Sequence, residues 1–363
     1  MIKVLLIGLS RNLGGIETYI YNLIKYSNKE KFSFDILCAE KEKIALEEEF
    51  ISFGCEIIRV TPRKENYKRH VQELREIFEK REYDYLHYSV MSYSWCEPIL
   101  IANKYSKAKI IIHSHNAGFD KNSSLKIKML HKVGFLRIKK ISFLKVACGE
   151  AAGKFMFNGN DFTIFNNGID LDKFKFCMEH RKEIRREMKV SEETTVFGLI
   201  AKLEYQKNVL FLIDIFYEIT KLKENVVLAI VGEGSLKEAI CERIEKYNIK
   251  DKVLLMGRRN DANKAYSAFD IFLMPSLYEG LSISLIEAQV SGLRCYTSDT
   301  VDPKSNITGN VEFISLDKTA KEWAEQIING NNQKDKDVLK KVPEEYNAVN
   351  SYQKVYEYYE KNR

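Results

Sequence analysis

Short apolar runs alternate with amphipathic stretches along the whole chain. In the first half, β-branched and apolar residues bounded by turn residues predict strands at 2–8, 34–39, 56–60, 83–88, 109–114 and 143–149. Apolar residues recur at helical spacing between these runs, over 16–26, 66–80 and 97–105. Strands that alternate with helices predict a parallel sheet covered by helices, which is a doubly wound α/β lobe.

A second series of the same kind follows a break near residue 170. Asn166, Asn167 and Gly168 supply turn chemistry at the break. Strand-like runs then resume at 196–201, 226–232, 253–257, 270–275, 294–298 and 311–315. We therefore predict an N-terminal lobe over 1–170, a second doubly wound lobe over 171–342, and a helix within 343–363 that packs back across the junction between them.

Composition narrows the class of protein. With 363 residues, 45% hydrophobic and 30% charged, the chain has room for two globular lobes and little resemblance to a disordered or fibrous protein. Its seven cysteines are scattered, which argues against a disulfide framework or a paired zinc site and predicts a cytoplasmic protein. No apolar run approaches the ~18 residues of a membrane span, so we expect any membrane contact to be peripheral.

The first predicted strand ends in a glycine-rich turn, residues 8–15, that leads into a helix. Gly14 and Gly15 would let the backbone approach a ligand closely at the start of that helix. The turn lacks the G-x-G-x-x-G spacing of a dehydrogenase and the G-K-[ST] ending of a P-loop. Taken alone, it is equally compatible with an ordinary strand–helix connection.

A more specific pattern lies between Pro275 and Ala288, where Glu279 precedes a predicted helix and Glu287 falls in its second turn. Glu279 could accept hydrogen bonds from sugar hydroxyls, while the N–H groups at the helix start favour an anion. The backbone positions at this helix start that we predict to bind the donor are Gly280, Leu281, Ser282 and Ile283. An isolated pair of acids with this spacing would more often be a solvated helix start, so the context decides.

That context is a family resemblance. The segment EGLSISLIEA (279–288), preceded by DIFLMPSLY and followed by QVSGLRCYTSD, resembles the donor-binding segment of retaining glycosyltransferases of family 4. Further similar motifs occur in the family's order: GGIE (14–17), HSHN (113–116), NNGID (166–170), AKLEYQKN (201–208) and VGEG (231–234). The resemblance spans nearly the whole chain and implies the GT-B fold, in which two doubly wound lobes face a central cleft.

The resemblance also implies roles for individual residues. Glu279 would bind donor sugar hydroxyls near the reacting carbon, and Glu287 would bind the ribose. AKLEYQKN is similar to the family's G-R-x-x-x-x-K diphosphate clamp, which maps onto Lys202 and Lys207. Lys202 replaces an arginine, so it keeps the charge but loses the bidentate fork. His115 aligns with the family histidine beside the donor sugar, which makes His115, Lys207 and Glu279 the predicted catalytic set.

Two histidines in one short segment raise the question of a metal. His113 and His115 are two residues apart, so in an extended segment their side chains should point to opposite faces. No nearby cysteine or acidic cluster completes a ligand set. We therefore predict no metal site and interpret His113 as a core residue, in line with a family that works without a bound metal.

Residues 121–145 form a basic amphipathic stretch in which eight lysines and arginines are interleaved with apolar residues and no acidic residue occurs. Such a segment could dock on an anionic membrane surface. A solvated helix face is an equally good interpretation. Nucleic acid is disfavoured, because the net charge of +6 is modest and no recognition motif accompanies it.

The resemblance implies a metal-independent, retaining hexosyltransferase without a cofactor, which takes its sugar from a nucleotide-sugar, with UDP-sugar as the expected donor. The acceptor would be a glycan or a lipid-linked oligosaccharide in capsule or exopolysaccharide synthesis, at the inner face of the plasma membrane. Retention would proceed by front-face attack without a covalent nucleophile. Two alternatives stay open: a GT-B sugar-nucleotide epimerase, and a catalytically weakened subunit that supports a partner enzyme, suggested by Lys202 in place of arginine.

Overall fold

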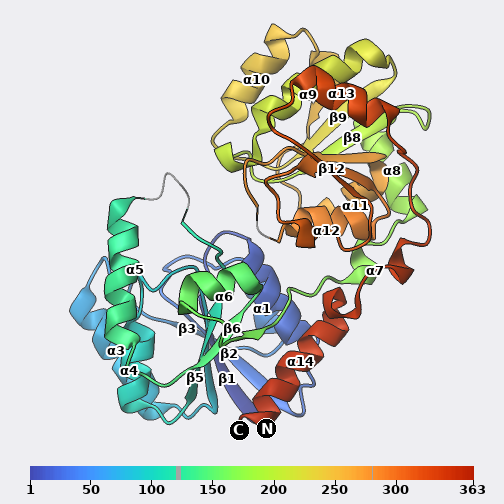
Figure 1. Ribbon diagram of the computed structural model, residues 1–363. Coiled ribbons are helices and arrows are strands. Elements are labelled where there is room, and N and C mark those ends of the chain that lie inside the picture. Colours follow the sequence, from blue (N-terminus) through green and yellow to red (C-terminus); the bar gives the residue numbers. More distant parts are fainter. Residues whose placement is uncertain (120–123, 280) are drawn as a thin grey trace. The chain divides into compact units, whose positions relative to one another are not determined.

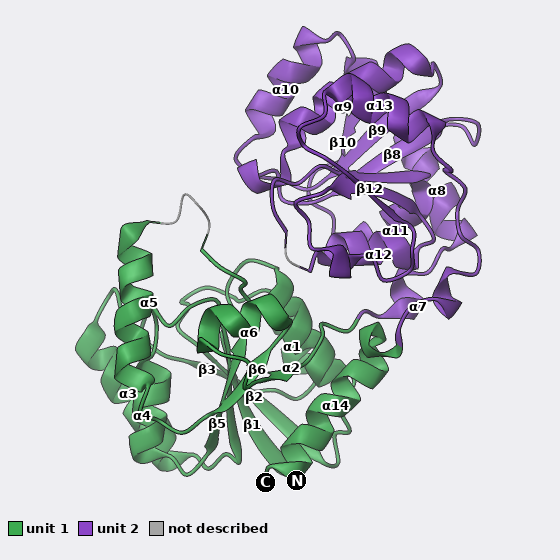
Figure 2. Cartoon of the chain, viewed as in Figure 1, with its two compact units in different colours: residues 1–168, 344–363 green, residues 169–343 purple. Residues whose placement is uncertain are grey.

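The computed structural model describes residues 1–119, 124–279 and 281–363. It divides into two compact units (Figure 2). One unit comprises Met1–Gly168 together with Glu344–Arg363, and the other comprises Ile169–Pro343. The final helix, which the sequence analysis treated as a separate segment after 342, therefore groups with the first unit.

A parallel sheet forms the centre of the first unit (Figure 1). Its strands are β1 (Ile2–Ile7), β2 (Phe32–Cys38), β3 (Ile57–Arg59), β4 (Tyr85–Val90), β5 (Lys109–Ser114), β6 (Leu144–Ala147) and β7 (Thr163–Ile164). They lie in the order β3-β2-β1-β4-β5-β6-β7, so the strand order reverses between β1 and β4. Such a reversal is the usual ligand-binding position of a doubly wound sheet.

Helices cover both faces of this sheet. They are α1 (Gly15–Lys25), α2 (Glu47–Ser52), α3 (Tyr67–Lys80), α4 (Glu97–Tyr105), α5 (Leu125–Ile138), α6 (Glu150–Phe157) and α14 (Ala348–Lys361), with the short 3-10 helix η5 (Glu344–Tyr346) before α14. Because successive side chains of β1 point to opposite faces of the sheet, Val4 and Leu6 lie in one core cluster and Leu5 and Ile7 lie in the other. The first cluster is shared with α14.

The second unit repeats this architecture. Its strands are β8 (Thr195–Ile200), β9 (Val226–Val231), β10 (Val253–Leu255), β11 (Ile271–Met274), β12 (Arg294–Ser298) and β13 (Val311–Ile314), in the order β10-β9-β8-β11-β12-β13. Its helices are α7 (Leu171–Phe174), α8 (Met178–Met188), α9 (Val209–Leu222), α10 (Lys237–Lys246), α11 (Ala262–Ala268), α12 (Ile283–Val290) and α13 (Ala320–Asn329). Its 3-10 helices are η1 (Tyr205–Lys207), η2 (Lys250–Lys252), η3 (Pro303–Ser305) and η4 (Val338–Lys340). Here the strand order reverses between β8 and β11.

Every run that the sequence analysis assigned to a strand forms one. The sequence analysis missed one strand before the break that it predicts near residue 170, because β7 lies there and pairs with β6. A strand of two residues is too short to show alternation in the sequence.

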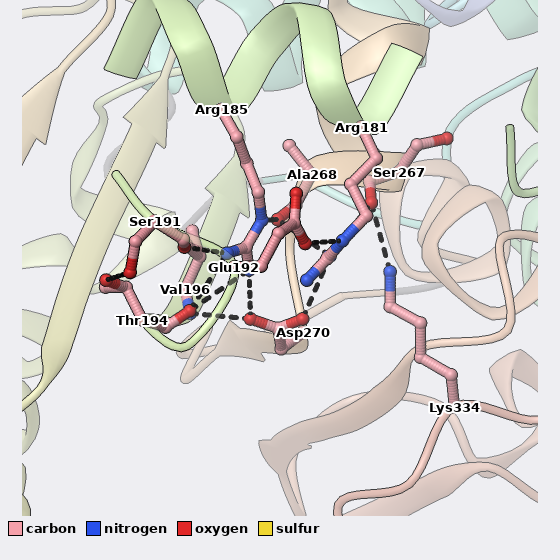
Figure 3. A network of polar contacts seen from close by, with 10 residues as sticks. All are labelled: Arg181, Arg185, Ser191, Glu192, Thr194, Val196, Ser267, Ala268, Asp270 and Lys334. Atoms are coloured by element: carbon pink, nitrogen blue, oxygen red, sulfur yellow. Dashed lines mark hydrogen bonds and ion pairs between the residues drawn. The ribbon is translucent and has the colours of Figure 1, made fainter. Parts of the chain in front are cut away.

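A buried ionic network anchors α8 beneath the sheet of the second unit (Figure 3). Arg185 is 1% exposed and donates to the carboxylate of Asp270 at 2.5 Å, and Arg181 pairs with the same carboxylate at 3.0 Å. Lys334 donates to the carbonyl of Ser267 at 3.1 Å, and burial lowers the pKa of Lys334 to about 7. Because Asp270 immediately precedes β11, this network lies at the amino end of the strand, away from the edge that binds ligands in such sheets.

Candidate functional site

The predicted donor residues follow two neighbouring strands of the second unit. The segment Ala201–Lys207 comes after β8, and Pro275–Glu279 comes after β11. These strands are hydrogen-bonded neighbours at the reversal of the strand order, with Ile271 opposite Phe197. Ligands of doubly wound sheets bind outside the carboxyl ends of the strands at this reversal, so the fold brings both segments to the expected position.

Lys207 and Glu279 form an ion pair at this edge. The Lys207 ammonium donates to the Glu279 carboxylate, and their side chains are only 17% and 11% exposed. Gln206 holds the two loops together, because its backbone carbonyl accepts from Leu277 at 2.8 Å and its side-chain amide donates to the Tyr278 carbonyl at 2.9 Å. A lysine kept close to the surface but partly shielded from water is well placed to attract an anion.

The second predicted cation differs from the first. Lys202 is exposed, and none of the ion pairs within the described ranges involves it. A hydrogen bond from the Ser235 hydroxyl lowers the pKa of Glu204, and the charge of Lys202 acts weakly in the same direction. The structure therefore shows one cation held by the protein and one that extends into solvent.

Helix α12 begins beside this ion pair. Ser282 is its N-cap residue and Ile283 its first helical residue, while the preceding Leu281 is half-buried; Gly280 lies outside the described residues. The Ser282 hydroxyl makes no capping bond, so it leaves first-turn N–H groups uncovered. The expectation that the N–H groups at the helix start are available to an anion needs one correction, because the N–H of Ser282 donates to the Ser305 hydroxyl at 3.4 Å.

Glu287 lies in the second turn of α12, as the sequence predicted, and Tyr266 on α11 donates its hydroxyl hydrogen to it at 2.7 Å. Burial raises the pKa of Glu287 to about 7, against the opposing effects of this hydrogen bond and of the Lys173 ammonium on α7. The carboxyl group therefore changes its charge near neutral pH.

In the first unit, the glycine-rich turn follows β1. Gly8 has a φ of +124°, and a Cβ atom there would lie 2.1 Å from the carbonyl oxygen of Ser89 at the neighbouring strand β4. Only glycine allows this approach. Gly14 is the extended N-cap residue of α1 and Gly15 is its first residue, and a Cβ atom at Gly15 would meet open space.

A buried carboxylate closes the same turn. Glu17, 5% exposed, accepts hydrogen bonds from the N–H of Ser10 at 2.9 Å and from its hydroxyl at 2.8 Å. The sequence analysis assigned no role to Glu17, although the GGIE motif that it quoted contains this residue. Glu17 shapes the turn and keeps its own charge away from the outer surface of the loop.

His115 and His113 lie in contact, with ring centroids 4.1 Å apart. The expectation that they point to opposite faces was wrong, because β5 ends at Ser114 and His115 lies beyond the alternating segment. His113 is fully buried, as expected of a core residue, and shares a hydrogen bond of 3.1 Å with His87. Tyr19 packs against both rings of the HSHN motif.

The ring of His115 has no hydrogen-bond partner on either nitrogen within the described part of the chain, although both nitrogens are buried. Burial, and to a smaller extent the neighbouring His87, lowers the pKa of His115 to about 3. The imidazole is therefore neutral at physiological pH. A neutral ring with two unused nitrogens can donate one hydrogen bond and accept another.

No three histidine, cysteine or acidic side chains converge as metal ligands among the residues that the structure describes. The sequence contains two Asp-x-Asp runs, 170–172 and 335–337. Their carboxylates accept backbone hydrogen bonds or pair with nearby lysines.

The sequence analysis predicted Lys207, Glu279 and Glu287 as site residues but did not single out Gln206 and Tyr266, which hold their surroundings in place. Gln206 lies inside the quoted AKLEYQKN motif, so that motif contained the signal. Tyr266 lies in a short helix without any motif, and only the fold brings it to Glu287.

Comparison with protein families divides the chain in the same way as the structure. Residues 13–173 match the model described as Glycosyltransferase Family 4, and residues 180–341 match the model described as Glycosyl transferases group 1. Together the two models cover most of both units, in order.

Individual relatives agree with this result. The chain is 29% identical to a protein named putative glycosyltransferase EpsF of Bacillus subtilis, over 87% of this chain and 84% of that protein. It is 24% identical to the UDP-Gal:alpha-D-GlcNAc-diphosphoundecaprenol alpha-1,3-galactosyltransferase of Escherichia coli, over 85% and 80% of the two chains. The fold is similar to that of Anabaena Alr3699/HepE in complex with UDP and glucose, with a TM-score of 0.77, 14% identity and 99% of each chain covered.

Proposed function

Because the chain belongs to the family 4 type of glycosyltransferases with the GT-B fold, we propose that it transfers a hexose from a nucleotide-sugar to a hydroxyl of a glycan or lipid-linked acceptor. The observation that carries this proposal is the position of the Lys207–Glu279 pair, at the reversal of the second sheet and beside the start of α12. This place combines a cation, uncovered N–H groups and a carboxylate, which suit a diphosphate and a sugar.

Leaving-group stabilisation is the main task of such a site. As the glycosidic bond breaks, negative charge develops on the nucleoside diphosphate. Lys207 exchanges its contact with Glu279 for one with the diphosphate, and the N-terminus of α12 supplies further positive potential. The released Glu279 carboxylate then accepts hydrogen bonds from the donor sugar, while Glu287 accepts them from the ribose.

We propose UDP as the nucleotide and retention as the stereochemical outcome. UDP is supported by the Escherichia coli relative, whose name specifies UDP-Gal, and by the similar fold bound to UDP and glucose. Retention rests on the family resemblance. In this mechanism the acceptor hydroxyl attacks from the face that the diphosphate leaves, and a diphosphate oxygen takes its proton, so no metal and no covalent nucleophile is required. His115, neutral and without a protein partner among the described residues, is proposed to hydrogen-bond the donor sugar.

The acceptor and its location are proposed from two observations. The name of the Escherichia coli relative specifies a diphosphoundecaprenol-linked acceptor, which is a lipid. On α5, Leu125, Met129 and Leu136 are 83%, 61% and 58% exposed and share one face of the helix, which Lys128 and Lys132 flank. Within the described ranges, no helix is long and apolar enough to span a bilayer. We propose that α5 rests on the anionic inner face of the plasma membrane, where this enzyme would serve cell-surface polysaccharide synthesis.

Donor titration tests the proposed activity. Purified protein is titrated with UDP-, GDP- and ADP-sugars, and slow hydrolysis of each donor is followed in parallel. We expect one UDP-hexose to bind selectively, and Lys207→Ala to lower the hydrolysis rate by roughly 100- to 1,000-fold, because it removes one charge from the leaving group. Lys221→Ala, in an exposed pair on α9, is the matched control and should behave as wild type.

Two outcomes would contradict the proposal. If the protein binds none of these donors, the non-catalytic subunit becomes the better interpretation. If it binds a donor and releases an epimerised sugar nucleotide without an acceptor, the chain is an epimerase.

A further inference from the structure

The segment 300–310, which follows β12, runs beside the proposed donor residues. Because β12 pairs with β11, this segment leaves the sheet at the same edge as Pro275–Glu279. Val301 forms a parallel β-bridge with Glu279, and the N–H of Asp302 donates to the Glu279 carbonyl at 3.2 Å. The backbone of Glu279 is therefore held by a segment that lies outside every motif of the sequence analysis.

The same segment contacts the start of α12. The Ser305 hydroxyl accepts a hydrogen bond from the N–H of the N-cap residue Ser282 at 3.4 Å, and both residues are buried. Two parts of the proposed donor site thus share one support. These parts are the loop that carries the Glu279 carboxylate and the first turn that would face the diphosphate.

Gln289 holds this segment against α12. Its side chain is fully buried, and it lies seven residues after Ser282, which places both on one side of the helix. The side-chain oxygen of Gln289 accepts from the N–H of Ile307 at 3.0 Å, and from the N–H and hydroxyl of Thr308 at 3.2 and 3.1 Å. Its side-chain nitrogen donates to the Ser305 carbonyl at 2.7 Å.

These contacts require an amide at position 289. The nitrogen of Gln289 faces the carbonyl oxygens of Ser305 and Leu285, which can only accept, whereas its oxygen faces the backbone N–H groups of 307 and 308. A carboxylate would place an oxygen against both carbonyls, and an apolar side chain would leave the N–H groups unpaired. A buried amide with partners on both ends specifies one arrangement of the backbone around it.

From these contacts we propose that Gln289 is a positioning residue of the donor site. It fixes the segment 300–310, and this segment fixes Glu279 relative to the first turn of α12. Gln289 itself contacts no substrate. The inference rests on the proposed glycosyltransferase function, because the displaced groups are those that bind the sugar and the leaving diphosphate. A misplacement of about 1 Å in such groups can lower a rate by roughly 100-fold.

Donor hydrolysis by Gln289→Met tests the consequence for the site. This substitution keeps the length of the side chain and removes both hydrogen-bonding groups. We expect kcat for hydrolysis of the UDP-hexose to fall by roughly 10- to 100-fold. The affinity for UMP, which lacks the sugar and the second phosphate, should stay unchanged, because Tyr266 holds the ribose-binding Glu287 independently. Thr308→Val removes only one donor to Gln289 and should change kcat in the same direction by less.

Two controls separate positioning from a general loss of stability. Gln326→Met is the same substitution on α13, where the half-buried amide links Glu312 and Lys318, and it should leave kcat unchanged. Asp270→Asn removes the counter-charge of Arg185 at the amino end of β11. At a temperature at which this variant is folded, it should also hydrolyse the donor at the wild-type rate.

Amide hydrogen exchange tests the contact without any donor. Gln289→Met should raise the exchange rate by roughly tenfold in peptides that contain Glu279, Ser282 or Ser305, and Gln326→Met should not. The inference is overturned if exchange in these peptides stays at the wild-type rate, if Asp270→Asn loses as much kcat as Gln289→Met, or if UMP affinity falls in parallel with kcat. Should Gln289→Met fail to fold, Thr308→Val decides by both measurements. Absence of donor hydrolysis in the wild type would count against the proposed function, whereas hydrogen exchange would still decide whether Gln289 holds Glu279 and α12 in place.

Discussion

Tyr266 donates a hydrogen bond of 2.7 Å to Glu287, whose pKa burial raises to about 7. Lowering the pH through 7 therefore protonates the group that we assign to the donor ribose. Hydrogen bonds to an ionised acceptor are stronger than those to a neutral one, so we expect donor affinity to fall by about five- to tenfold below pH 7. Measuring the donor KM across this range tests the prediction, and Glu287→Gln should abolish the pH dependence.

Tyr266→Phe is the control for this prediction. It removes a hydrogen bond that lowers the pKa of Glu287, so the drop in affinity should move to higher pH. The same titration affects stability. In the folded state Glu287 stays protonated up to about pH 7, whereas in the unfolded state it loses its proton near its ordinary pKa of 4.5. Its contribution to the free energy of unfolding is therefore complete below pH 4.5 and is lost as the pH rises through 7. A donor KM that stays flat across pH 7 in the wild type would show that Glu287 does not contact the donor.

Asp270 neutralises Arg185, whose side chain is only 2% exposed. Asp270→Asn removes the carboxylate and leaves a buried guanidinium without its counter-charge. We expect the free energy of unfolding of the second unit to fall by about 3–5 kcal/mol, measured by urea denaturation. The matched control is Asp337→Asn, which breaks an exposed pair with Lys340 and should cost about 1 kcal/mol or less. If the two substitutions lowered the free energy of unfolding equally, the network shown in Figure 3 would not stabilise the second unit as proposed.

Vesicle binding tests the proposal that the exposed face of α5 contacts the membrane. We expect the protein to co-sediment with vesicles that contain phosphatidylglycerol and to stay in solution with pure phosphatidylcholine. Replacing both Lys128 and Lys132 by glutamine should weaken binding by roughly 30-fold, since each cation near an anionic surface contributes about 1 kcal/mol. The same change at Lys246 and Lys250, in the second unit, should have no effect. Binding to both kinds of vesicle, or to neither, would refute the proposal for α5.

The sequence was sufficient for the fold because strands buried on both faces are nearly continuous apolar runs. β9 is buried at every position and is such a run. β4 is also buried throughout, although His87 and Ser89 interrupt its apolar residues. The pairing of Lys207 with Glu279 was also within reach, because both follow strands that end at the same edge of the sheet.

Contacts between elements that are distant in sequence could not be predicted in this way. Tyr266 reaches Glu287 from another helix, and the contact between His113 and His115 depends on where β5 ends. The pKa of Glu287 likewise results from burial by neighbours that no motif specifies. Such features depend on tertiary packing, which periodicity does not encode.

Helix α14 packs Tyr352, Tyr356 and Tyr359 into the same core as β1, and Tyr356 donates its hydroxyl hydrogen to the carbonyl of Leu23 at 2.5 Å. The first unit is therefore built from the two ends of the chain, while residues 169–343 form a continuous unit. During synthesis residues 169–343 leave the ribosome before residues 344–363, so the unit that begins first is completed after the second one. The face of β1 that α14 covers stays exposed until α14 has emerged, and the second unit can fold before the first one closes.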